Sequence, residues 1–118
     1  MTVKTFKEIL AWQKAHELVL EIYRITTKFP RYEEFGLSNQ MRRSAVSIPS
    51  NIAEGFKRKH LKDSLNFYNI SDASLEELKY QLLLSRDIGY IDETTYNAIF
   101  SKTEEAGRLL CGWSKSQK

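Results

Sequence analysis

Apolar residues recur at steps of three and four through four long segments of this chain, and this spacing restricts its fold more than any other feature. Such spacing places the apolar side chains on one face of an α-helix. The first segment runs from about Lys7 to Phe29, and its stripe is Ala11, Ala15, Leu18, Ile22, Ile25 and Phe29. Only two prolines and five glycines are present, which is little material for the turns of an all-β fold. We therefore expect an all-α protein.

Three further segments continue the pattern after short breaks. The second begins near Ser38, which we expect to be its N-cap, and its stripe is Leu37, Met41, Ala45, Ile48, Ile52 and Phe56. The third stripe is Leu61, Leu65 or Ser64, Tyr68, Ser71, Leu75, Leu78, Leu82 and Ser85. The fourth is Tyr96, Ile99, Phe100, Thr103, Ala106, Leu110 and Trp113. Between the last two segments, Gly89 is expected at the C-terminal cap of one helix and Asp92 at the N-cap of the next.

The sequence thus predicts helices near 9–29, 38–57, 61–88 and 93–113 in an antiparallel up-down four-helix bundle. With 118 residues, we expect one domain spanning 1–118, with residues 114–118 as a frayed tail. No apolar run approaches the length of a membrane span, and charges interrupt any signal-peptide pattern in "MTVKTFKEIL". A single cysteine, Cys111, fits a reducing compartment, so a cytoplasmic protein without membrane partners is expected.

Positive charge is concentrated in one part of the sequence. Residues 1–60 contain 11 Lys and Arg against 6 Asp and Glu, whereas residues 61–118 contain 7 against 9. The excess gathers around the second segment, at Arg42, Arg43, Lys57, Arg58, Lys59 and Lys62. A charge run is often only a solvated face, but a local excess of this kind also suits a polyanion such as RNA or DNA. These six residues are the predicted nucleic-acid-binding site.

The stretch "SAVSIPSNIAEG" combines helical spacing with a proline and several small residues. Ser44, Ser47, Asn51 and Gly55 fall on one line of the helix, where they would let a neighbouring helix approach closely. Pro49 removes one backbone donor, so a kink near residues 45–49 is expected. The motif has two interpretations: a kinked helix shaped for packing, or a kink that forms an assembly surface while the flanking cations face a polyanion.

A second stripe on the first helix suggests assembly. Trp12, Val19, Tyr23 and Thr26 lie beside its main apolar stripe and make a wider face than a lone bundle needs. We expect that this stripe and the small-residue line cannot both be satisfied easily in one four-helix core. A closed homo-oligomeric ring is therefore predicted.

Three stretches carry a resemblance: "LAWQKAHELVLEIYRIT", "FPRYEEFGLSNQMRRSAVSIPSNIAEGFKR" and "SDASLEELKYQLLLSRDIGYI". Together they resemble the four-helix-bundle family encoded by intervening sequences inside bacterial 23S ribosomal RNA genes, over almost the whole chain. The family motif falls on Gln40, Arg42, Arg43, Ser47, Pro49, Asn51, Glu54, Gly55, Ser74, Glu76 and Leu78. That family in turn is similar to the accessory variability protein of diversity-generating retroelements. The resemblance implies a homopentameric barrel with basic surfaces and, by analogy with the retroelement relative, binding to a reverse transcriptase and nucleic acid.

No constellation for catalysis or metal binding is evident. His16 and His60 lack the Glu-x-x-His pairs of a di-iron bundle, since Gln13 and Lys57 stand three residues before them. Cys111 is best interpreted as a packing residue, and no cofactor is expected. Glu54 and Glu76 are expected to pair with Arg42, Arg43 or Arg58, or to cap backbone groups, in preference to acting as an acid–base pair. They complete a predicted packing and oligomer motif of Trp12, Ser44, Ser47, Pro49, Asn51, Glu54, Gly55 and Glu76.

The leading functional hypothesis is a non-enzymatic homo-oligomer that binds RNA or DNA through a basic surface. Poor interleaving of aromatic residues with the cations favours contacts to the backbone over reading of the bases. The alternative is an adaptor or accessory subunit whose partner is another protein.

Overall fold

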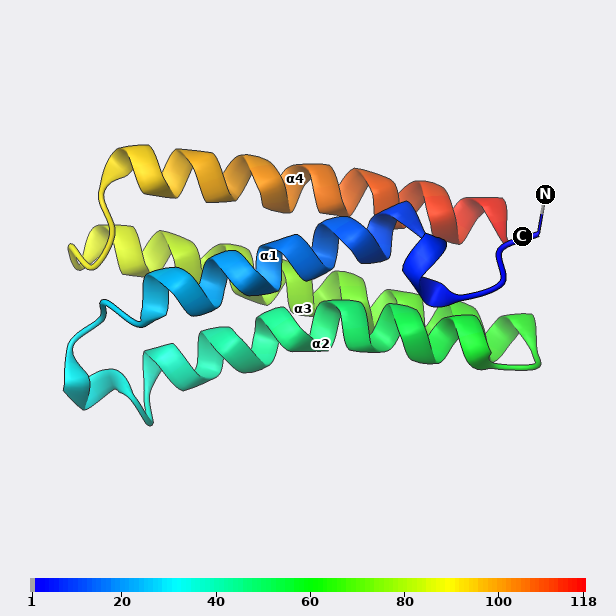
Figure 1. Ribbon diagram of the computed structural model, residues 1–118, viewed down its shortest axis with the longest axis horizontal. Helices are drawn as coiled ribbons and strands as arrows, with labels where there is room; N and C mark the ends of the chain where they lie inside the picture. The colour runs from blue at the N-terminus through cyan, green and yellow to red at the C-terminus, as the bar shows by residue number, and fades with distance from the viewer. Residues whose placement is uncertain (1) are drawn as a thin grey trace.

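The computed structural model describes residues 2–118 and is built from four long helices. They are α1 (Leu10–Thr26), α2 (Leu37–Lys57), α3 (Leu61–Asp87) and α4 (Glu93–Ser116), with short 3₁₀ helices η1 (Phe6–Glu8) and η2 (Arg31–Glu33) before α1 and α2. No strand occurs within residues 2–118. In Figure 1 each long helix runs back along the one before it, with the connections at the two ends of a bundle measuring 44 × 26 × 19 Å. The all-α four-helix bundle predicted from the sequence is confirmed.

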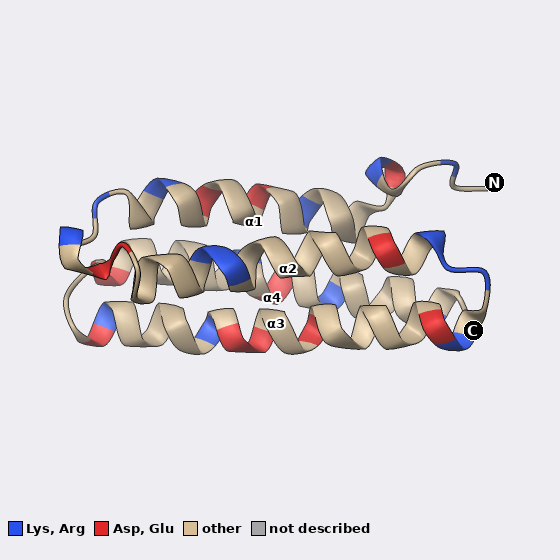
Figure 2. Cartoon of the chain, turned by 90° about the horizontal axis from the view of Figure 1, so that it is seen from below, with Lys and Arg blue, Asp and Glu red and all other residues tan. Residues whose placement is uncertain are grey.

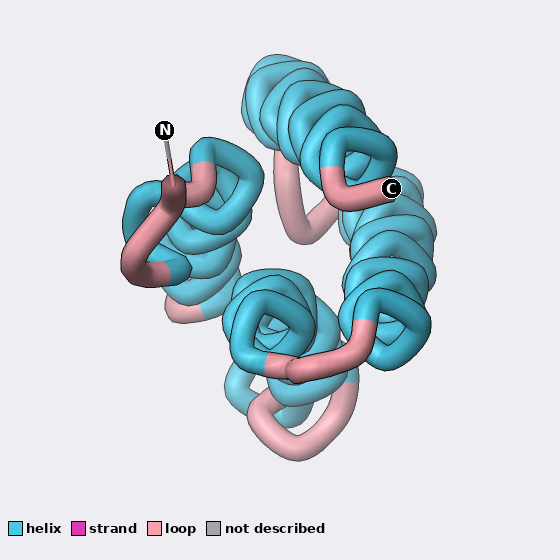
Figure 3. Tube along the Cα trace, turned by 90° about the vertical axis from the view of Figure 1, so that its right-hand side faces the viewer, coloured by secondary structure: helices cyan, strands magenta, loops and turns pink. Residues whose placement is uncertain are grey.

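The predicted apolar stripes form one core between the four helices. The predicted stripe residues from Ala11 to Phe29 are buried, and so are the α2 stripe residues Leu37, Met41, Ala45, Ile48 and Ile52. Leu61, predicted to begin the α3 stripe, is 45% exposed and lies outside the core. α2 packs most extensively against α3, while α1 and α4 complete the ring of neighbouring helices, as the end view in Figure 3 shows. Ser71, Ser85 and Thr103 are fully buried among the apolar side chains. These small residues occupy stripe positions where two helices lie close together.

Helix ends differ from the sequence prediction at several points. α1 ends at Thr26, not Phe29, and the hydroxyls of Thr26 and Thr27 bond to carbonyls of the preceding turn. Ser38 is not the N-cap of α2: the helix begins at Leu37, whose amide donates to the Glu33 carboxylate at 3.1 Å. The η2 turn brings Glu33 in front of the helix, so its carboxylate supplies the cap that Ser38 was expected to provide.

The α3–α4 connection follows the prediction closely. Gly89 has a φ of 85°, a left-handed conformation that suits glycine after a helix end. The Asp92 carboxylate accepts a hydrogen bond of 2.7 Å from the Thr95 amide and caps α4. α4 then continues to Ser116, so residues 114–116, expected in a frayed tail, are helical. Helical assignment also continues through Pro49 in α2, and a kink there stays a prediction.

Candidate nucleic-acid interface

The turn between α2 and α3 presents four of the six predicted cations together. α2 ends at Lys57, Arg58 has extended backbone (φ −72°, ψ 147°), and α3 begins three residues later. Lys57, Arg58, Lys59 and Lys62 are all exposed. Figure 2 shows this turn as a continuous basic segment at the end of the bundle.

Within residues 2–118, Arg58 is the one cation of this turn whose side chain contacts an acidic or aromatic side chain. Its guanidinium carbon lies 4.6 Å from the centre of the Phe67 ring on α3. One of its nitrogens lies 3.8 Å from the Glu54 carboxylate, one turn earlier in α2. Both partners of this ion pair are about half exposed, so the pair contributes little to stability and leaves the guanidinium accessible.

Both chain ends lie at the same end of the bundle as the α2–α3 turn (Figures 1 and 3). They bring Lys4, Lys7, Lys115 and Lys118 to it, none of which the sequence prediction included. We call residues 2–8, 54–63 and 114–118 the basic end. It contains eight Lys and Arg against three Asp and Glu, a net charge of +5, whereas the rest of the chain contains ten against twelve. The whole positive excess of the protein therefore lies at one end of the bundle.

The cations of the basic end form fewer ion pairs than the other cations of the chain. Within residues 2–118, Arg58 is the only cation of the basic end that lies within 4.0 Å of a carboxylate. Elsewhere, five of the ten Lys and Arg form ion pairs: Lys14, Arg24, Lys79, Arg86 and Lys102. Seven of the eight cations at the basic end are thus gathered together without an ion pair within residues 2–118.

Arg42 and Arg43 do not belong to this cluster. They precede Lys57 in α2 by fourteen or fifteen residues, which is about 22 Å along the helix axis. The Arg42 Nε–H donates to the Thr26 hydroxyl at 2.9 Å, and its guanidinium lies over the Tyr23 ring. Arg42 therefore ties α2 to α1, and neither arginine pairs with Glu54 or Glu76 as had been expected. The structure divides the six predicted residues into two separate groups.

The small-residue line packs against α3 within the same subunit. The Ser47 and Ser74 hydroxyls lie 2.9 Å apart, and the Asn51 amide donates to the Ser47 carbonyl at 2.7 Å. Gly55 is buried against Tyr68, and Ser44 is also buried. The line is thus accounted for by close α2–α3 packing in one chain, which removes it as an argument for a ring.

The remaining motif residues have varied surroundings. Trp12 packs edge-on against Phe6 and stacks on the His16 ring at 5.1 Å, within the same chain. Glu54 pairs with Arg58, one of the arginines expected, but Glu76 pairs with Lys79 at 3.5 Å. Both carboxylates are mostly exposed, at 57% and 72%. In the second α1 stripe, Val19 and Thr26 are buried while Tyr23 is 44% exposed.

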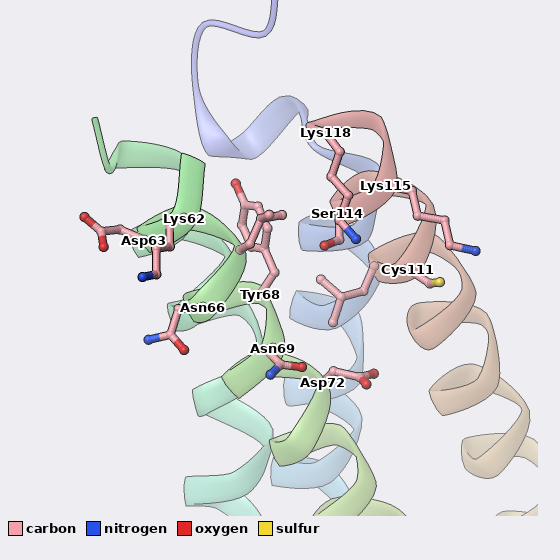
Figure 4. A pocket seen from close by; sticks show the side chains of 12 residues that line it. Lys62, Asp63, Asn66, Tyr68, Asn69, Asp72, Cys111, Ser114, Lys115 and Lys118 are labelled. Atoms are coloured by element: carbon pink, nitrogen blue, oxygen red, sulfur yellow. The ribbon is translucent and has the colours of Figure 1, made fainter. Parts of the chain in front are cut away.

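A groove between α3 and α4 opens beside the basic end (Figure 4). It has a volume of about 670 Å³, and its walls are Lys62, Asp63, Leu65, Asn66, Tyr68, Asn69 and Asp72 from α3, and Leu110, Cys111, Ser114, Lys115 and Lys118 from the C-terminal part of the chain. The groove was not predicted from the sequence, because residues 114–118 were expected to form a frayed tail. The spacing of Cys111, Ser114, Lys115 and Lys118 along one helical face could have indicated it.

Tyr68 provides a polar group between the two walls of the groove. The residue is 3% exposed, and its ring packs edge-on against that of Trp113, with 6.3 Å between the ring centres. Burial raises the pKa of the Tyr68 hydroxyl, an effect that the Trp113 indole N–H opposes. The indole N–H itself is buried without a hydrogen-bond partner within residues 2–118. Tyr68 therefore carries its proton at neutral pH and is available as a donor.

Residues 2–118 contain no group of three or more His, Cys, Asp or Glu side chains placed to hold a metal ion. In the same range, every helix is too short or too polar to cross a membrane. The free Cys111 is exposed at the groove, so its expected packing role is wrong.

These features define an all-α four-helix bundle with a concentration of unpaired cations at one end. The chain belongs to the 23S rRNA-intervening sequence protein family, whose pattern it matches over residues 7–112. It is also similar to a crystal structure of a protein of unknown function from the S23 ribosomal protein family of Bacteroides thetaiotaomicron VPI-5482. That comparison has a TM-score of 0.80 and 28% identity, and covers 90% of this chain and 99% of the other. A comparison with curated proteins finds no match.

Proposed function

We propose that this protein is a non-enzymatic binder of RNA or DNA that contacts phosphates through the basic end. The observation that carries the proposal is the gathering of eight Lys and Arg at one end, seven of them without an ion pair within residues 2–118. A lysine without an ion pair loses its hydrating water favourably only beside an anion. A polyphosphate backbone supplies several such anions at once. Because seven of the eight cations are lysines, which are flexible point charges, the contacts would position the backbone without reading the sequence.

Binding should depend strongly on salt. If four phosphates of a single strand are neutralised, affinity falls by about 50-fold between about 50 and 200 mM salt, since each contact releases bound counterions. Fluorescence anisotropy with a labelled single-stranded RNA and the DNA of the same sequence measures this directly. Absence of binding to both at low salt would contradict the proposal.

We further propose that the protein self-associates, with the homopentamer implied by the family resemblance as the expected form. Support comes from exposed apolar side chains on the α1–α2 side, where Tyr23 and Val46 are 44% and 39% exposed. They line a shallow groove with Arg42, Arg43 and Ser47. A ring would repeat the basic end several times, so that weak phosphate contacts combine into stronger binding.

The adaptor function is favoured by a different observation. Phe35 is 89% exposed in the α1–α2 connection, and Tyr32 in the same connection is 78% exposed. Exposed aromatic residues of this kind suit a protein interface. Stoichiometric co-purification of another polypeptide in the absence of nucleic acid would favour the adaptor function, provided that Phe35→Ala abolishes it. A reverse transcriptase is the partner suggested by family analogy.

A further inference from the structure

The α3–α4 groove differs from the rest of the basic end because it combines charge with a shaped, partly apolar surface. Its rim carries Lys62, Lys115 and Lys118, Leu65 contributes apolar surface, and the almost fully buried Leu110 also lines it. A volume of about 670 Å³ lies in the range of small-ligand pockets. A lysine cluster that only contacts phosphates needs no such cavity.

Polar groups for hydrogen bonding line one wall of the groove. Asn66, Asn69 and Asp72 follow one another at intervals of three residues, so they lie along one face of α3. Figure 4 shows the Asn69 amide and the Asp72 carboxylate on the side of α3 that faces α4, with Tyr68 between the helices and Asn66 at the outer edge of α3. Asparagine amides, a carboxylate and a tyrosine hydroxyl offer both donors and acceptors, which is the set needed to bind the edge of an unpaired base.

We infer that the groove accepts one unpaired nucleotide of a single-stranded nucleic acid, an inference that rests on the proposed function and names its substrate class. The base lies against Leu65 and Leu110, and Asn66 and Asn69 bond to its edge. The phosphates on either side of this nucleotide contact Lys62, Lys115 and Lys118. A base inside a duplex is stacked and paired, so it cannot enter the groove without being flipped out.

Tyr68 adds a hydroxyl to the groove, beside the Trp113 indole. A base acceptor in the groove can accept a hydrogen bond from this hydroxyl. Asp63 and Asp72 also line the groove, and their negative charges favour phosphates at the lysines of the rim over the carboxylates.

The test compares a labelled single-stranded RNA, the DNA of the same sequence and the matching duplex, using wild-type protein and the double variant Asn66→Ala/Asn69→Ala. Both asparagines are exposed on α3, and the substitution leaves every charge in place. We expect affinity for one or both single strands to fall about tenfold, the equivalent of one or two lost hydrogen bonds, while duplex affinity stays within twofold of wild type. The matched control is Asn97→Ala, at an exposed asparagine of α4 outside the groove. This substitution should change neither the single-strand affinity nor the duplex affinity.

Cys111 gives an independent measure of occupancy. It is the only cysteine of the chain, and it is exposed on the groove wall. Saturating single strand should slow the reaction of its thiol with a soluble thiol reagent several-fold, and saturating duplex should not. The inference would be overturned if single strand and duplex slowed the thiol reaction equally and the asparagine variant kept wild-type affinity for single strands. The proposed function would then still stand. Failure of all three nucleic acids to bind at low salt would contradict both.

Discussion

The Ser71 hydroxyl on α3 donates a hydrogen bond of 2.8 Å to the backbone carbonyl of Ile48 on α2, one residue before Pro49. Ser71 is fully buried between the two helices. The bond therefore joins the two most extensively packed helices beside the proline of the motif. Close packing of α2 on α3 also fixes the α2–α3 turn, which carries half of the cations at the basic end.

Replacing Ser71 by alanine should lower the free energy of unfolding by about 1 kcal/mol, because one buried hydrogen bond is lost. Ser71→Val should lower it further, since the added methyl groups force the helices apart. Urea denaturation measures both changes. Ser101→Ala, an exposed serine of α4, serves as control, and equal stability of all three variants would show that the Ser71–Ile48 contact is unimportant.

Two glycines in helices should respond to alanine in opposite directions. A Cβ at Gly55 would lie 2.5 Å from Cε1 of Tyr68 and 3.1 Å from Cβ of Phe67, so the substitution must displace a buried ring. Overpacking of this kind lowers stability by about 1–3 kcal/mol, which outweighs the gain in helix propensity. At Gly112 a Cβ meets nothing within 4 Å, and Gly112→Ala should raise stability by up to about 1 kcal/mol. Thermal denaturation of the two variants checks the contrast; a stabilised Gly55→Ala would contradict the packing described here.

The Lys79–Glu104 ion pair should make stability depend on pH. The Lys79 ammonium, at 2.8 Å, lowers the pKa of Glu104, while Glu104 and then Glu76 raise the pKa of Lys79. A depressed carboxyl pKa stabilises the folded state above the unfolded value of about 4.3, and this contribution is lost as the pH falls through the folded pKa. The raised pKa of Lys79 stabilises the folded state below the unfolded value of about 10.4. This stabilisation is lost as the pH rises through the folded pKa.

Wild type should therefore melt at a higher temperature than Glu104→Gln near neutral pH, and the two should converge in strong acid. Melting curves from acid to neutral pH test this. Glu77→Gln is a suitable control because Glu77 is exposed and forms no ion pair within residues 2–118. A constant difference between wild type and Glu104→Gln at all pH values would rule out the electrostatic explanation.

Self-association should be visible at tens of micromolar, on the order of concentrations where moderate affinities give complete assembly. Analytical ultracentrifugation is expected to give the mass of a closed ring, five subunits by the resemblance. Tyr23→Ser/Val46→Ser should shift the distribution toward monomer, because apolar area on the α1–α2 side is lost. A wild-type monomer at this concentration would contradict assembly.

The sequence predicted the helices well because their apolar stripes have a clear period. Ser71 and Thr103 were correctly placed on these stripes despite being polar. The cap of α2 was missed because it comes from Glu33 in a preceding turn, not from the residue beside the helix. The basic site was predicted only in part. Local charge identified the α2–α3 turn, but only the three-dimensional arrangement brings in Lys115 and Lys118 and separates Arg42 and Arg43.

The most direct test of the basic end compares two triple charge reversals. One is Lys57→Glu/Arg58→Glu/Lys59→Glu; the control is Lys28→Glu/Arg31→Glu/Arg108→Glu, three exposed cations elsewhere that form no ion pair within residues 2–118. Circular dichroism and ultracentrifugation first establish that both variants keep the helical content and assembly of the wild type. Each protein is then titrated into labelled single-stranded RNA and DNA over a range of salt concentrations.

Charge reversal at the turn should weaken binding at low salt and reduce the slope of log K against log salt by about 2, for three lost phosphate contacts on a single strand. The control, with the same change in net charge, should retain nearly the wild-type slope. If reversal at the turn leaves affinity unchanged at low salt, the basic end is not the nucleic-acid site.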